Sequence, residues 1–172
     1  SALTALISGA GNTAVGYEAG KAMTTSDENT IIGYKAYTAG NNADTTGENT
    51  IIGYQAAYQA SNTGFTQNTI IGKQAAGSVV NHAANNNTCV GWQSLNNLTT
   101  GDNNVAIGRG SSGTLSTGSQ NVHVGNGTEA SASGASYEVV IGQEVRGGGD
   151  YTTTIGNGNI FRFLSKSVTC DL

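Results

Sequence analysis

The sequence repeats one short motif, mostly every 17 to 20 residues. The hexapeptide NTIIGY stands at Asn29–Tyr34 and again at Asn49–Tyr54, and NTIIG returns at Asn68–Gly72. Related pentapeptides end in nine glycines, and these glycines lie 17, 20, 19, 19, 17, 17, 17 and 14 residues apart. Repeats of paired helices need about 33 residues or more, whereas a shorter regular period predicts a β-solenoid with one turn per repeat. The motif glycines are Gly16, Gly33, Gly53, Gly72, Gly91, Gly108, Gly125, Gly142 and Gly156.

Apolar residues occupy both faces of each expected strand. The residue before the glycine is always Val or Ile, and the residue three before it is Thr or Val. These β-branched residues share one face of a strand, which we assign to the interior of the roll. The column two before the glycine is mostly apolar as well, and a strand buried on both faces needs a second layer. We therefore expect this column to pack against other copies of the chain. Its members are Ala14, Ile31, Ile51, Ile70, Cys89, Ala106, His123 and Val140.

An asparagine column precedes the strands and favours in-register stacking of the turns. Stacked amides can hydrogen-bond from one turn to the next, as in the side-chain ladders of cross-β structures. We expect such a ladder from Asn12, Asn29, Asn49, Asn68, Asn87, Asn104 and Asn121.

Composition excludes several classes of function. The seven Lys and Arg are scattered and the net charge is −4, so nucleic-acid binding is not expected. No apolar run approaches the roughly 18 residues of a membrane span, so membrane insertion is not expected either. Cys89 and Cys170 lack metal-ligand spacing, and we interpret Cys89 as a buried free thiol. No nucleophile and base stand in a catalytic pattern, so we expect no enzyme, catalytic residue, metal or cofactor. A depolymerising fibre with acids assembled across turns stays open as an alternative.

The repeat resembles a known family. NNVAIGRGS at Asn103–Ser111 and QNVHVGNGT at Gln120–Thr128 resemble the YadA-like head repeat of trimeric autotransporter adhesins. The longer form, as in NTAVGYEAG, is similar to repeats of phage and other viral tail fibres, and the resemblance covers about Gly11 to Gly156. It implies a left-handed parallel β-roll, a parallel homotrimer around a threefold axis, and a role in surface attachment. It also implies that the column two before the glycine forms the trimer interface.

We expect three regions: an N-terminal lead-in or stalk stump (1–11), a YadA-like β-roll repeat domain (12–156), and a C-terminal cap or junction (157–172). The chain begins at Ser1 and not Met, and we interpret it as a piece of a longer protein. Long turns and aromatics after the glycine favour a virion tail fibre that binds a host cell-surface glycan or protein receptor. The alternatives are the head of a bacterial trimeric adhesin on the cell surface and a purely structural fibre shaft.

Two groups of residues are candidates for receptor contact. Tyr17, Tyr34, Tyr54 and Trp92 follow motif glycines and form one column with Lys73 and Arg109. Such a column can present rings to sugars, or it can be a structural stack of rings and cations. Insertions in a solenoid become loops on one side, often the binding side, although neutral variation in loop length explains them equally well. The candidates in and near the inserted stretches are Tyr37, Asn41, Asn42, Asp44, Tyr58, Asn62, Phe65 and His82.

Two further expectations depend on which face lies inside. In a trimer His123 would meet two symmetry copies near the axis, where three imidazoles can bind a metal, although we expect an ordinary packed histidine. An ice-binding solenoid would need a flat exposed threonine column. The available column shares a face with Val and Ile, and we assign it to the interior. It consists of Thr13, Thr30, Thr50, Thr69 and Thr88.

Overall fold

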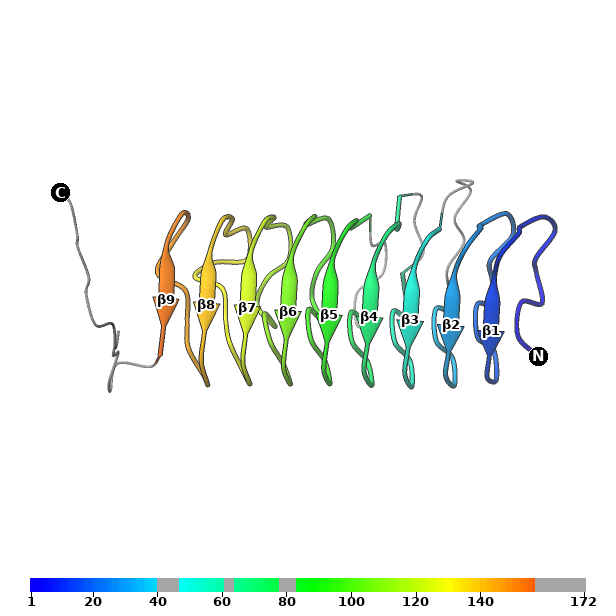
Figure 1. The fold of residues 1–172 in the computed structure, drawn as a ribbon, viewed down its shortest axis with the longest axis horizontal. Coiled ribbons are helices and arrows are strands. Elements are labelled where there is room, and N and C mark those ends of the chain that lie inside the picture. Colours follow the sequence, from blue (N-terminus) through cyan, green and yellow to red (C-terminus); the bar gives the residue numbers. More distant parts are fainter. Residues whose placement is uncertain (40–46, 61–63, 78–82, 157–172) are drawn as a thin grey trace, which may run out of the picture.

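The computed structural model is a parallel β-solenoid, whose strands follow one another along a single long axis (Figure 1). It describes residues 1–39, 47–60, 64–77 and 83–156. The described part contains no helix, and therefore none that could cross a membrane. Nine three-residue strands form one sheet in chain order, and each neighbouring pair is parallel. The strands are β1 (Thr13–Val15), β2 (Thr30–Ile32), β3 (Thr50–Ile52), β4 (Thr69–Ile71), β5 (Thr88–Val90), β6 (Val105–Ile107), β7 (Val122–Val124), β8 (Val139–Ile141) and β9 (Thr153–Ile155).

The register stacks the repeats column on column, as the motif spacing predicts. Ile31 pairs with Ile51, and Ile51 in turn pairs with Ile70. The glycine after each strand allows the chain to leave the sheet at once. Gly33, for example, has φ +140°, and a Cβ there would collide with the carbonyl oxygen of Gly53 in the next turn. A side chain is therefore excluded at this position by both conformation and space.

The interior of the roll lies on the opposite face from the one assigned to it by sequence. The middle residue of each strand points inward: Ile31 and Ile51 have no exposed surface. The residue before the glycine points outward, so that Ile32 remains 37% exposed. Both the assignment of the Val/Ile column to the interior and the assignment of the middle column to an interface are therefore wrong. Residues fully buried by their own chain offer no surface to another copy. They are Ile31, Ile51, Ile70, Cys89, Ala106, His123 and Val140, whereas Ala14 in the first turn is half-buried.

The predicted asparagine ladder is confirmed, and it explains which face lies inside. The Asn49 Nδ2 group donates to Asn29 Oδ1 at 3.1 Å, and the Asn49 backbone N–H donates to the same oxygen. The second Nδ2 hydrogen is donated to the carbonyl of Phe65 at 2.9 Å. Asn49 and Ile51 are two residues apart and share a strand face. A buried amide must be paired, and only the stacked interior supplies partners on both sides.

The returning segment closes the roll over this column with small side chains. These follow the motif glycine by three residues and are buried: Ala19, Ala36, Ala56, Ala75, Ser94, Ser111 and Thr128. Two of the hydroxyls also bond to the strands, because Ser94 Oγ donates to the carbonyl of Ala106 and Ser111 Oγ to that of His123. The core is therefore thin, and small side chains are what fit inside it.

The N-terminal residues stack onto the first turn, because the Leu3 N–H donates to Ala19 O at 3.0 Å and the Ile7 N–H to Thr24 O at 2.8 Å. The expected C-terminal cap, residues 157–172, lies outside the described residues.

Candidate functional site

The outer face of the sheet carries an apolar row along its full length. The row is formed by the residue before each motif glycine: Val15, Ile32, Ile52, Ile71, Val90, Ile107, Val124, Ile141 and Ile155. Neighbouring turns cover part of each side chain, and the exposed remainder is 36% at Ile71 and 41% at Ile107. The first strand residues are Thr in β1 to β5, Val in β6 to β8 and Thr again in β9; they lie on the same outer face and are mostly half-buried. We call this surface the outer strand face. A continuous apolar patch of this kind marks an interaction site more often than scattered residues do.

The aromatic column that the sequence predicts is present on the surface. The Tyr17 and Tyr34 rings stack at 5.3 Å with an interplanar angle of 18°, and Tyr34 and Tyr54 stack at 5.4 Å and 8°. Lys73 Nζ lies 5.7 Å from the Tyr54 ring centroid. In the same column, the Arg109 guanidinium lies 5.4 Å from the Trp92 ring. Stacked rings cover one another's faces and leave mainly their edges to solvent. This geometry favours the structural interpretation of the column over sugar stacking.

The loop candidates separate into three groups. Tyr37 and Phe65 are buried and stack on each other at 5.6 Å, so they belong to the core and cannot contact a receptor. Tyr58 is half-buried at the surface. The remaining candidates lie outside the described residues: Asn41, Asn42, Asp44, Asn62 and His82.

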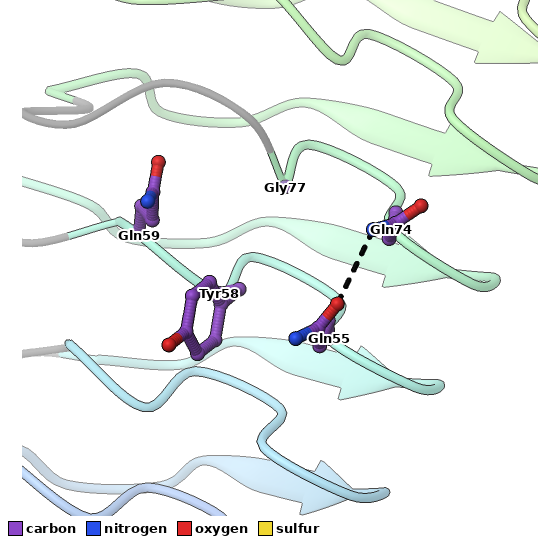
Figure 2. Close-up of a pocket in the computed structure, with 5 residues that line it drawn as sticks. All are labelled: Gln55, Tyr58, Gln59, Gln74 and Gly77. Atoms are coloured by element: carbon purple, nitrogen blue, oxygen red, sulfur yellow. Dashed lines mark hydrogen bonds between the residues drawn. The ribbon is translucent and has the colours of Figure 1, made fainter.

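A polar pocket on the surface was missed by sequence analysis (Figure 2). It has a volume of about 260 Å³ and is lined by Gln55, Tyr58, Gln59, Gln74 and Gly77. Gln74 Nε2 donates to Gln55 Oε1 at 3.2 Å, across two adjacent turns. The sequence does contain a signal for this pocket: in three successive repeats, a glutamine stands two residues after the motif glycine, at positions 55, 74 and 93.

A buried ionisable pair lies near the C-terminal end of the roll. Glu138 takes the place of the ladder asparagine, and its carboxylate accepts hydrogen bonds from the Ser131 N–H at 3.2 Å and the Gly149 N–H at 3.0 Å. His123 Nε2 lies 3.9 Å from Glu138 Oε2, and neither imidazole nitrogen has a hydrogen-bond partner. Burial lowers the pKa of His123, and the Glu138 charge partly opposes this shift. His123 points into its own roll, so three copies cannot meet on an axis.

One further titratable group, the Cys89 thiol, lies in the core. Burial raises the pKa of the Cys89 thiol to about 12, so this free thiol is protonated and unreactive at neutral pH. Within the described ranges, no group of three or more His, Cys, Asp or Glu residues is placed to bind a metal ion.

In comparisons with known proteins, no protein-family model matches the chain, and no curated protein or solved structure matches it either.

Proposed function

We propose that this chain is a segment of a trimeric surface-attachment fibre, and specifically of a virion tail fibre that binds a receptor on the host cell. The observation that carries the proposal is the outer strand face, which carries an apolar row along all nine strands. A fibre built from three parallel rolls would bury this face continuously. The resemblance to YadA-like and viral fibre repeats supports three copies and a left-handed roll.

The interface we propose replaces the one expected from sequence. Ile31, Ile51 and Ile70 fill the core, and their neighbours Ile32, Ile52 and Ile71 face the partner chains. Complete burial of an isoleucine contributes about 1.5–3 kcal/mol, so covering the remaining third contributes about 0.5–1 kcal/mol per copy. Summed over the stacked levels, this gain can offset the entropy lost on association.

The mass of the protein in solution tests the assembly. Three copies of the 17.4-kDa chain, about 52 kDa by light scattering on a size-exclusion column, are expected. A monomer at micromolar concentration would overturn the proposed fibre. Attachment itself is tested by the binding of labelled protein to host cells. If the assembled protein bound no cells, the structural-shaft alternative would be favoured over a receptor-binding segment.

Ice binding is a second candidate, from another class of function, because the threonine column lies on the outer strand face and not in the interior. Thr30, Thr50 and Thr69 form a regular row beside the isoleucines, and strands in such a sheet repeat every 4.8 Å or so. The row continues as Val105, Val122 and Val139, which limits its length. A monomer with thermal hysteresis in solution would support this candidate, and a trimer without hysteresis would exclude it.

A further inference from the structure

We propose that the pocket between the third and fourth turns binds one ring of a neutral saccharide, a proposal that rests on the receptor-binding role given above. The pocket is shown in Figure 2, and its described lining consists of Gln55, Tyr58, Gln59, Gln74 and Gly77. It is distinct from the aromatic column, whose rings are stacked on one another.

Two successive turns differ where they line the pocket: one has glycine at the position where its neighbour has a large side chain. Tyr58 and Gly77 both stand five residues after a motif glycine, in successive turns. The two turns are joined by the hydrogen bond from the Ala57 N–H to the Ala75 carbonyl at 2.9 Å. A Cβ at Gly77 would lie 3.0 Å from the backbone oxygens of Gln55 and Gln74, so this part of the lining has room for glycine alone without a shift of its neighbours. Tyr58 offers an aromatic surface to a ligand, which the stacked tyrosines of the column do not.

The amides on the other side of the pocket are held in place before any ligand binds. Gln74 Nε2 donates to Gln55 Oε1 at 3.2 Å, and Gln93 Nε2 donates to Gln74 Oε1 at 3.4 Å. A primary amide has two N–H donors and two acceptor lone pairs. These two hydrogen bonds use one donor and one lone pair of the Gln74 amide, so its second donor and second lone pair remain for ligand hydroxyls. Holding the side chains in advance lowers the entropic cost of binding.

The lining indicates the class of ligand. None of the five described lining residues is charged, so the lining itself offers no charged partner to the carboxylate of an acidic sugar, whereas its amides and Tyr58 suit a neutral one. A volume of about 260 Å³ lies just below the range of about 300–1,000 Å³ usual for drug-sized ligands. One ring therefore fits better than a chain of them. A pyranose presents C–H groups to an aromatic ring and hydroxyls to amides, which matches Tyr58 on one side and Gln55 and Gln74 on the other.

The test measures binding of simple sugars to the purified protein. The probes are the methyl pyranosides of glucose, galactose, mannose and N-acetylglucosamine, with methyl N-acetylneuraminide as the charged comparison, observed by saturation-transfer NMR and calorimetry. We expect at least one neutral probe to bind with millimolar affinity. Tyr58→Ala and Gln74→Met are each expected to weaken it at least tenfold. Tyr151→Ala, which removes an exposed ring outside the pocket, is the matched control and should bind as wild type.

The outcomes separate this proposal from the proposed function. Failure of every neutral probe to bind at 20 mM, or wild-type affinity in both Tyr58→Ala and Gln74→Met, would overturn the saccharide site. Melting curves identify a variant that has lost its fold. If one of the two pocket variants is unfolded, the affinity of the other one tests the saccharide site. Cell binding that survives both substitutions would leave the attachment role standing without this pocket. Sugar binding by a protein that attaches to no cell would leave the pocket standing without the role.

Discussion

Two neighbouring isoleucines provide the sharpest test of the orientation of the sheet. Ile70 is 1% exposed and faces the interior, whereas Ile71 is 36% exposed and lies on the outer strand face. Truncation of Ile70 to alanine should destabilise the fold by about 2–5 kcal/mol, because it leaves a cavity in a packed core. Lysine at Ile71 should leave the fold intact and weaken the proposed trimer.

The magnitude of the outer-face effect follows from the remaining exposure. Three copies of one outer isoleucine should contribute roughly 1.5–3 kcal/mol when they become buried together. The triple variant Ile32→Lys, Ile71→Lys and Ile107→Lys would remove three such levels, or roughly 4.5–9 kcal/mol before any charge is considered. This is comparable with the roughly 8 kcal/mol that holds a micromolar complex together. The desolvation of the ammonium groups adds several kcal/mol more.

The assay compares mass and melting temperature. The triple lysine variant should elute as a 17.4-kDa monomer that keeps the circular dichroism spectrum of the wild type. The matched control is Gln67→Lys, Gln120→Lys and Gln143→Lys, which adds the same charge at exposed positions outside the strands and should remain at 52 kDa. The reasoning would be refuted if the outer-face variant stayed trimeric, or if Ile70→Ala melted like the wild type.

Three other predictions concern the interior. Asn68→Ala should lower the free energy of unfolding by about 1–3 kcal/mol or more in urea titrations, because the Asn87 N–H and the Ala84 carbonyl lose their hydrogen-bond partner. Asn86→Ala, at an exposed position, is the control. Equal losses of stability in the two variants would argue against the ladder. Burial lowers the folded-state pKa of His123 below its usual 6.5, so the unfolded state binds more protons and stability should be lost as pH falls below about 6.5. His123→Val should reduce this loss between pH 7.5 and pH 5, and an unchanged pH dependence would contradict it. The Cys89 thiol, with its pKa raised to about 12, should resist iodoacetamide at pH 8 until the protein is unfolded. Peptide mapping measures the labelling, and rapid labelling of Cys89 in the folded protein would contradict this prediction.

A left-handed backbone conformation recurs at fixed positions of the repeat. Among the residues that the structure describes, twenty other than glycine have positive φ, and Gln55 and Gln74 of the pocket are among them, with φ of 53° and 56°. The corresponding residues in other turns, such as Glu18 and Lys35, share this conformation. It is therefore a property of the repeat and no sign of function. The choice of side chain at these positions is free to vary, and the glutamines of the third to fifth turns are a local feature.

The buried residues near the inserted stretches show where local pattern was insufficient. Tyr37 and Phe65 look in sequence like exposed loop aromatics, yet they pack together in the core. Similarly, Glu138 gives no sign in sequence that it replaces an asparagine of the ladder and lies beside His123. In each case the partner comes from a neighbouring turn, and the loop lengths that determine the alignment vary from turn to turn.

The spacing of the motif by itself determined the solenoid, the nine strands, their parallel in-register stacking and the asparagine ladder. It could do so because a repeat constrains every turn to the same path. The inward face was decided only by the tertiary structure, since the Ile-Ile pair of each strand is apolar on both sides. The amide ladder must be paired and enclosed, and this draws the middle residue inward and leaves Ile32, Ile71 and Ile107 outside. The pocket likewise depends on Tyr58 and Gly77 meeting from successive turns, which no local pattern contains.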